Sequence, residues 1–244
     1  MSVAASSGNN ATTTTTKTLF ITGASSGIGA ATAVAAVQAG WNVALFARRQ
    51  DRLDALVQTL GGDDKALALV GDVADLASLT AAVAQTVHKF GGLHAAFANA
   101  GTGLSKPGGT QQGDPAEWKH MVDTNIMGML YTTRAVLPEL KKTKGTLVLT
   151  GSIAGRIHMK GSIYGATKWF VHGYAGNMAQ EMREWGGRCS IVAPGMTNTE
   201  FFEQPKPDKL QARDVAQSVL HAITAPSHVS IQEIVVMPTN SSWV

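Results

Sequence analysis

The chain has 244 residues, of which 44% are hydrophobic and 15% are charged, and its formal net charge is +3. This length and composition favour one globular α/β domain with a full hydrophobic core. The basic residues are scattered along the chain, so we expect no nucleic-acid partner. We expect no membrane partner either, because no apolar run reaches the ~18 residues that a membrane helix needs.

The single cysteine, Cys189, excludes a disulfide within one chain, so we expect a reducing compartment, the cytoplasm. The seven histidines show no metal-ligand spacing, and we expect no metal site. Residues 1–16 are rich in Ser, Thr and Ala and lack the basic and apolar segments of a signal peptide. We expect a disordered tail there, followed by a single folded domain at 17–244.

Apolar runs alternate with stretches of helical period along the whole chain. In chain order they predict strand 17–22, helix 27–39, strand 42–47, helix 50–60, strand 66–71, helix 75–90, strand 94–98, helix 114–141, strand 145–150, helix 162–185, strand 188–193, helix 212–224 and strand 230–236. Strands that are apolar throughout belong in a parallel sheet that is covered on both faces. The pattern predicts a doubly wound α/β fold with a seven-stranded parallel sheet and helices on both faces.

Two irregular stretches, 102–113 and 195–210, follow predicted strands. Both should therefore lie at the carboxyl edge of the sheet, where folds of this kind bind ligands.

A glycine-rich turn follows the first strand and opens the first helix. Its glycines permit a tight turn and a close approach of the backbone to a pyrophosphate, and the free amides at the helix start face anions. Two serine hydroxyls can add further donors. The alternative is a merely tight turn between strand and helix. The predicted phosphate-contacting residues are Gly23, Ser25, Ser26, Gly27, Ile28 and Gly29.

The second strand ends at Ala47, where a site for NAD would usually offer an acid to the ribose 2′-hydroxyl. Arg48 and Arg49 follow instead. A guanidinium can bind a 2′-phosphate in bidentate fashion, whereas an acid would repel it. We therefore predict NADP(H) as the cofactor, with Arg48 as the main contact; Arg49 is the more natural candidate for a solvated turn.

Two further strand ends complete the predicted cofactor site. Asp72 and Val73 follow the third strand, and Asp72 can meet the adenine amino group or cap the next helix. Asn99, Ala100 and Gly101 follow the fourth strand, where small residues let the chain run past the adenosine ribose.

Tyr164 and Lys168 are four residues apart on a predicted helix and so share one face. A nearby ammonium lowers the pKa of a phenol from about 10, so Tyr164 can protonate a forming alkoxide. Lys168 can also hold the nicotinamide ribose hydroxyls. Ser152, just past the fifth strand, can donate a hydrogen bond to the substrate oxygen. Asn125, within the long predicted helix, can hold a water that links Lys168 to solvent.

This ordered set of residues, together with Pro194 and Gly195, resembles the short-chain dehydrogenase/reductase family over residues 17–238. The resemblance implies a Rossmann-like fold and a catalytic tetrad. It implies that Thr197 and Thr199 contact the nicotinamide amide and a nearby phosphate. It also implies a homotetramer or dimer packed through the two long helices that flank the fifth strand. The implied catalytic tetrad is Asn125, Ser152, Tyr164 and Lys168.

The predicted substrate pocket is mostly apolar, which favours a hydrophobic ketone or aldehyde. Arg156 can instead bind a carboxylate, which would make the protein a 3-hydroxy-acid dehydrogenase, or it can point to solvent. Two prolines stiffen the short lid after Gly195, and we expect a relatively open site. A non-catalytic NADP(H) sensor is the alternative from another class, although a sensor has no need of a proton donor. The predicted pocket residues are Leu104, Ile153, Arg156, His158, Met196, Phe201 and Phe202.

Overall fold

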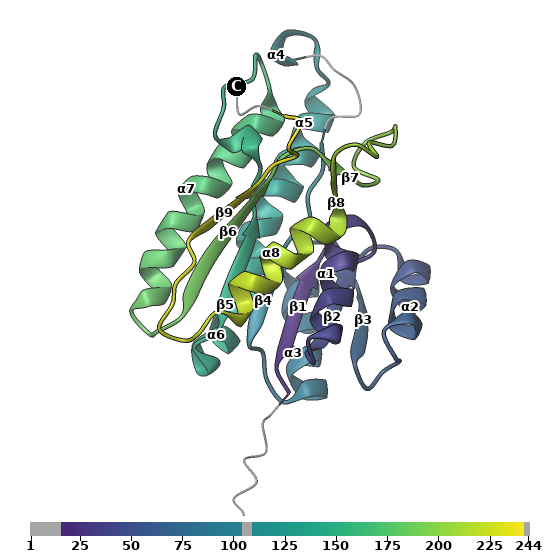
Figure 1. Ribbon diagram of the computed structural model, residues 1–244, viewed down its shortest axis with the longest axis vertical. Helices are drawn as coiled ribbons and strands as arrows, with labels where there is room; N and C mark the ends of the chain where they lie inside the picture. Colours follow the sequence, from purple (N-terminus) through teal and green to yellow (C-terminus); the bar gives the residue numbers. More distant parts are fainter. Residues whose placement is uncertain (1–15, 104–108, 242–244) are drawn as a thin grey trace, which may run out of the picture.

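The computed structural model describes residues 16–103 and 109–241 (Figure 1). Apart from Thr16, the tail expected at residues 1–16 lies outside the described residues, as does Leu104 of the expected substrate pocket.

Seven strands form one parallel sheet in the order β3-β2-β1-β4-β5-β6-β9. The prediction of a seven-stranded, doubly wound α/β fold is confirmed. Strand order reverses between β1 and β4, and in open sheets the crevice at such a reversal is where ligands bind. The strands are β1 (Thr18–Thr22), β2 (Asn42–Ala47), β3 (Ala66–Val70), β4 (Ala95–Ala98), β5 (Thr146–Thr150), β6 (Arg188–Pro194) and β9 (Glu233–Val236).

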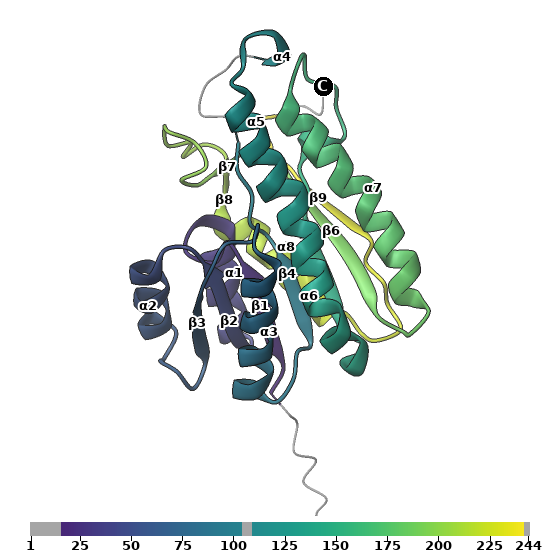
Figure 2. The same ribbon diagram turned by 180° about the vertical axis from the view of Figure 1, so that it is seen from behind.

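Helices cover both faces of the sheet. Helices α1, α2 and α8 pack on one face, and α3, α6 and α7 pack on the other. Figure 1 shows α1 and α8 in front of the strands. Figure 2 shows the opposite face of the sheet, with α3 and α6 in front of the strands. Their bounds are α1 (Gly27–Gln38), α2 (Gln50–Thr59), α3 (Leu76–Phe90), α6 (Gly128–Thr143), α7 (Ile163–Arg183) and α8 (Ala212–Thr224).

Successive side chains along each strand point to opposite faces of the sheet and pack into two separate hydrophobic cores. In β1, Leu19 and Ile21 join the cluster under α1 and α8, whereas Phe20 joins the cluster under α3 and α6. All three side chains are fully buried. Full burial of such a side chain stabilises the fold by roughly 1.5–3 kcal/mol. This two-sided burial explains why the strands are apolar at successive positions instead of at alternate ones.

The long helix expected at 114–141 is interrupted. The structure has α5 (Pro115–Val122), a π-helical turn at Asp123–Met127 and then α6. A π turn inserts one extra residue into the helix without changing the apolar period strongly enough to be seen in the sequence.

Short elements also lie outside the sequence prediction, among them a 3-10 turn at Ile153–Gly155. Helix α4 (Gly109–Gln112) falls in the first irregular stretch. Strands β7 (Thr197–Asn198) and β8 (Leu210–Gln211) pair in parallel and close the base of the second irregular stretch. Two-residue strands have no periodicity to detect, because their pairing is decided by tertiary contacts.

Within the described ranges, none of the helices has the length and apolar character that a membrane crossing would require.

Candidate functional site

The glycine loop between β1 and α1 is a cradle that larger residues would fill. Gly23 has a φ of +65°, and a Cβ there would lie 2.9 Å from the Cα of Ala100. A Cβ on Gly29 would lie 2.4 Å from the carbonyl oxygen of Gly23. The loop therefore requires glycine at both positions, and the first turn of α1 stays open to a close ligand. This geometry fits a dinucleotide phosphate.

Asn99 fixes this loop from the end of β4. Its side-chain amide donates to the carbonyl oxygens of Thr22 and Gly23 at 3.0 and 3.3 Å, and its backbone amide donates to the Thr22 hydroxyl at 3.0 Å. The sequence suggested only that small residues pass a ribose here. In the structure the Asn99 side chain instead joins the ends of β1 and β4 across the point where the strand order reverses.

The two arginines after β2 differ in their surroundings, and Arg49 contacts the glycine loop. The Arg49 guanidinium donates to the hydroxyls of Ser25 and Ser26, with Nη2 at 2.9 and 2.8 Å from the two oxygens. The Arg48 side chain is 66% exposed and lies 3.8 Å from Asp72. Arg49 is the N-cap residue of α2 and its side chain reaches the glycine loop, whereas the Arg48 side chain is mostly exposed. The expectation that Arg49 lies on a solvated turn is wrong.

Glu200 joins the lid segment to this arginine cluster, a contact that the sequence did not suggest. Its carboxylate lies 3.1 Å from Arg49 Nη1 and 2.6 Å from Arg52 Nη1. Hydrogen bonds from Arg52 and Arg49 lower the pKa of Glu200. The residues are 148 to 151 positions apart in the chain, which is why no local pattern predicts the contact.

Asp72 does not cap the next helix. Its Oδ1 accepts from the backbone amide of Ala74 at 2.9 Å, whereas Asp75 caps α3 by accepting from Ala77 and Ser78. Val73 is buried against Gly128 at the start of α6, where a Cβ would lie 2.6 Å from Val73 Cγ2. These residues hold the turn after β3 beside α6.

Tyr164, Lys168 and Ser152 come together at the carboxyl end of β5. Ser162 caps α7 by accepting from the Gly165 amide at 2.9 Å, which places Tyr164 in the first turn. Lys168 is 4% exposed, and its Nζ donates to the carbonyl oxygen of Thr150 at 2.9 Å. The same Nζ lies 5.7 Å from the centroid of the Tyr164 ring. Ser152 is buried and hydrogen-bonds to Tyr164.

Burial dominates the ionisation of both helix residues. It lowers the pKa of Lys168 from 10.5 to about 8. It raises the pKa of Tyr164, and the hydrogen bond with Ser152 partly offsets this rise. The sequence led us to expect that the Lys168 ammonium lowers the pKa of Tyr164; in this structure desolvation of the phenolate is the larger effect and raises that pKa.

Asn125 lies in the π turn, but its side chain is already engaged. Its Oδ1 accepts from the Thr102 amide at 2.8 Å, and its Nδ2 donates to the Thr102 carbonyl and to the Thr167 hydroxyl at 2.9 and 3.1 Å. The amide therefore ties the segment after β4 to α7. The two Nδ2 protons are thus used, and the remaining acceptor position on Oδ1 is the one that the expected water could bind.

The lid after β6 lies over this centre. The Phe201 ring packs on the Tyr164 ring, with 5.6 Å between centroids, and Phe202 packs edge-on against Phe201 at 5.3 Å. Thr199 contacts the glycine loop, since a Cβ on Gly27 would lie 3.3 Å from its side chain. The Thr197 hydroxyl donates to the carbonyl oxygen of Gly195 at 3.0 Å. The expected open site is thus covered at Tyr164.

Two of the expected pocket residues have other partners. Arg156 forms a bidentate ion pair with Glu233 of β9. This pairing corrects the expectation that its guanidinium is available to a substrate carboxylate. His158 stacks on Trp169, with 5.3 Å between the ring centroids. Ile153 directly follows Ser152, and Met196, which is 41% exposed, directly follows Gly195.

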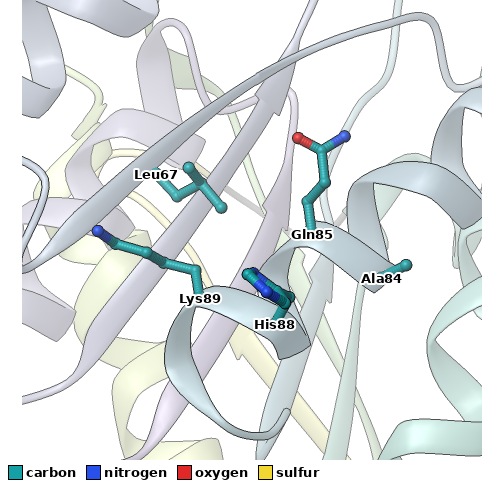
Figure 3. Close-up of a pocket in the computed structure, with 5 residues that line it drawn as sticks. All are labelled: Leu67, Ala84, Gln85, His88 and Lys89. Atoms are coloured by element: carbon teal, nitrogen blue, oxygen red, sulfur yellow. The ribbon is translucent and has the colours of Figure 1, made fainter.

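A cavity of about 440 Å³ lies elsewhere, between β3 and α3 (Figure 3). Its lining contains none of the predicted catalytic, cofactor or substrate residues, so this cavity is not the candidate active site. No cluster of three or more potential metal ligands occurs in the part of the chain that the structure describes. The lining residues are Leu67, Ala84, Gln85, His88 and Lys89.

Comparisons with known proteins agree with this geometry. The model of the short chain dehydrogenase family matches residues 17–210. Sulfoacetaldehyde reductase 2 of Chromohalobacter salexigens is 36% identical over 241 residues, which cover 92% of this chain and 95% of that protein. Sulfoacetaldehyde reductase of the same organism is 36% identical over 244 residues, covering 93% and 96%.

Solved structures extend the similarity to the whole fold. Serine dehydrogenase from Escherichia coli superposes with a TM-score of 0.83 at 30% identity, covering 92% of this chain and 99% of that one. Alcohol dehydrogenase from Thermococcus sibiricus, complexed with 5-hydroxy-NADP, has a TM-score of 0.83 at 26% identity and covers 93% and 98%.

Proposed function

The chain belongs to the short-chain dehydrogenase/reductase family, and we propose that it is an NADP(H)-dependent oxidoreductase that interconverts a ketone or aldehyde and its alcohol. The observation that carries this proposal is the position of the Tyr164 phenol. It is hydrogen-bonded to Ser152, and its ring centroid lies 5.7 Å from Lys168 Nζ. This group stands at the same sheet edge as the glycine loop.

In the proposed reaction, a bound nicotinamide cofactor supplies or accepts the hydride. Ser152 donates a hydrogen bond to the carbonyl oxygen as negative charge develops on it. The Tyr164 hydroxyl transfers a proton to that oxygen during reduction, and the phenolate removes it during oxidation. Lys168 is held by Thr150, and its ammonium stabilises the phenolate and holds ribose hydroxyls. Asn125 supports the site by fixing the backbone at Thr102.

The residues available to the cofactor support NADP(H). No acid stands at the end of β2, and two arginines follow it. Arg49 approaches the loop serines, and Arg48 is exposed at the strand end. In the proposed complex, the phosphates and the adenosine lie along the glycine loop and the ends of β2, β3 and β4. The residues assigned to it are Gly23, Ser25, Ser26, Gly27, Ile28, Gly29, Arg48, Arg49, Asp72, Val73, Asn99, Ala100, Gly101, Tyr164, Lys168, Pro194, Gly195, Thr197 and Thr199.

The names of the relatives support an aldehyde or alcohol as substrate. Two are sulfoacetaldehyde reductases, and two solved neighbours are an alcohol dehydrogenase and a serine dehydrogenase. The ion pair of Arg156 with Glu233 weakens the alternative of a 3-hydroxy-acid dehydrogenase that uses this arginine. The assembled Ser152, Tyr164 and Lys168 weigh against the alternative of a non-catalytic sensor.

We assign the activity to one domain at 17–244 and the protein to the cytoplasm, where the buried free thiol of Cys189 stays reduced. We assign it to a homotetramer or dimer through α6 and α7, and Trp169 of α7 is 43% exposed and available to such a contact.

The test is the oxidation of NADPH and of NADH against a panel of aldehydes, ketones and 3-oxo acids. The proposal predicts turnover of a carbonyl compound with NADPH preferred over NADH. Tight NADPH binding without turnover across the panel would favour the sensor, and equal use of both cofactors would contradict the NADP(H) assignment.

A further inference from the structure

A histidine that no part of the proposed reaction uses lies directly behind Ser152. His172 follows Lys168 by one helical turn on α7, and its side chain is 7% exposed. Its Nε2 lies 3.1 Å from the carbonyl oxygen of Ser152. The same oxygen accepts from the backbone amide of Gly155 at 2.9 Å. The Ser152 peptide is therefore held from two sides.

Two glycines leave the room that this ring occupies. A Cβ on Gly155 would lie 2.5 Å from His172 Cδ2, and a Cβ on Gly151 would lie 3.1 Å from His172 Nε2. The imidazole is thus wedged against the turn that carries Ser152. This close packing holds Nε2 beside the carbonyl oxygen of Ser152.

The opposite side of the ring faces a carboxylate. His172 Nδ1 lies 3.4 Å from Glu233 Oε1 at the start of β9. Glu233 is itself held by the bidentate contact with Arg156. Since Arg156 directly follows Gly155, His172, Glu233 and Arg156 lie together around the turn that carries Ser152.

The hydrogen-bond inventory fixes the tautomer of His172. A carbonyl oxygen only accepts, so Nε2 must carry a proton to bond to Ser152. In a neutral ring Nδ1 is then bare, and it has no hydrogen-bond partner among the described residues. Burial lowers the pKa of His172; Arg156 and Lys168 also lower it, while Glu233 and the bond to Ser152 raise it. Nε2 carries a proton and can donate to Ser152 in both the neutral and the protonated ring.

We propose that His172 is a positioning residue, whose Nε2–H holds the Ser152 peptide so that the Ser152 hydroxyl faces Tyr164. This inference rests on the proposed function, in which Ser152 and Tyr164 act on the same oxygen. The Ser152 hydroxyl is anchored in addition by the Ala154 amide at 3.1 Å, in the same turn. A rotation of the peptide at Ser152 therefore moves the hydroxyl as well.

Removal of the His172 Nε2–H donor should affect catalysis through the position of Ser152. A displacement of about 1 Å at a reacting group can reduce the rate up to about 100-fold. The hydrogen bond from Ser152 also lowers the pKa of Tyr164. Loss of this bond therefore raises that pKa while the charge on Lys168 is unchanged, and alcohol oxidation, which requires the phenolate, moves to higher pH.

The experiment compares His172→Leu, which removes the donor, with His172→Gln, which offers an amide N–H in its place. His221→Leu on α8 is the control, because it removes an exposed histidine. We expect His172→Leu to lower kcat about tenfold or more, leave the NADPH dissociation constant unchanged and shift the pH profile of oxidation upward. His172→Gln should recover most of the rate and the original profile, and His221→Leu should match the unaltered protein.

Wild-type kcat and pH profile in His172→Leu would overturn the inference, as would equal impairment in His172→Gln, which would indicate packing alone. Crystal structures of the two His172 variants provide a readout without turnover. The inference predicts that the Ser152 hydroxyl loses its bond to Tyr164 in His172→Leu and keeps it in His172→Gln. An unmoved Ser152 in both would contradict it. Absence of turnover in the unaltered enzyme would instead count against the proposed function.

Discussion

The ring of Phe201 lies over the ring of Tyr164, with 5.6 Å between their centroids and 55° between their planes. Phe201 comes from the segment between β7 and β8, and Tyr164 comes from the first turn of α7. Phe201 also fills the space beside Gly103, where a Cβ would lie 2.7 Å from its Cζ. The lid thus provides an apolar cover for the proposed proton donor.

Phe201→Ala should lower the pKa of Tyr164, because water then reaches a phenol whose pKa burial had raised. The pH at which alcohol oxidation reaches half its maximal rate should move downward, and the KM of an apolar substrate should rise several-fold with the loss of contact area. Initial rates measured over a range of pH and of substrate concentration give both quantities. Phe202→Ala, which loses only the edge contact with Phe201, should shift the profile less; equal profiles in all three proteins would contradict the role of Phe201.

Lys168→Met should stabilise the fold while it abolishes turnover. Burial lowers the pKa of Lys168 from 10.5 to about 8. Because the unfolded chain keeps its proton up to pH 10.5 and the folded protein only up to about pH 8, stability is lost as the pH falls through this window. The difference amounts to about 3 kcal/mol below the window, and the lost bond to Thr150 offsets about 1 kcal/mol of the gain.

Thermal unfolding at pH 7 and at pH 10 measures this effect. The variant should have a Tm several degrees higher than the unaltered protein at pH 7 and a smaller advantage at pH 10. Lys65→Met, at an exposed lysine, serves as the control and should leave both values nearly unchanged. A lower Tm for Lys168→Met at pH 7 would mean that the Thr150 contact outweighs the cost of burying the ammonium.

Arg49→Ala and Arg48→Ala should each weaken NADPH binding more than NADH binding, because only NADPH carries the 2′-phosphate. The loss should be about tenfold for Arg49, whose guanidinium already lies on the hydroxyls of Ser25 and Ser26. It should be smaller for the exposed Arg48. Titration calorimetry with both cofactors tests this, and an equal loss for NADPH and NADH would remove these arginines from the 2′-phosphate site.

Glu200→Gln should tighten NADPH binding, because the carboxylate competes with an anionic ligand for Arg49 and Arg52. The contacts are solvent-exposed, so the gain should be only a few-fold and should shrink in high salt. The matched control is Glu203→Gln, which removes the same charge from the same lid segment. Identical gains in the two variants would indicate a general charge effect, and no gain in Glu200→Gln would contradict direct competition.

Several features of the site could be predicted from the sequence because local patterns carry them. The glycine loop requires glycine for steric reasons, and the helical period places Tyr164 and Lys168 on one face of α7. The strands were predicted within a few residues, since burial on both faces makes them apolar throughout. These features depend on neighbours in the chain.

Other features depend on contacts between distant segments. The pairing of Arg156 with Glu233 joins residues 77 positions apart, and it decides whether that guanidinium is available to a substrate. The amide of Asn125 is engaged by Thr102 and Thr167, which a helical pattern cannot reveal. The position of His172 behind Ser152 was missed for the same reason, although its spacing from Lys168 places both on one helix face.

In the proposed reaction Tyr164 donates the proton to the substrate oxygen. The most direct test is Tyr164→Phe, with NADPH binding measured by calorimetry and carbonyl reduction measured by the loss of NADPH absorbance. Tyr164→Phe should still bind NADPH, with at most a few-fold loss of affinity because it lacks one proposed cofactor contact, while kcat should fall about 100-fold or more, the range of a general acid. A variant that binds NADPH and reduces the substrate at the rate of the unaltered enzyme would contradict this role of Tyr164.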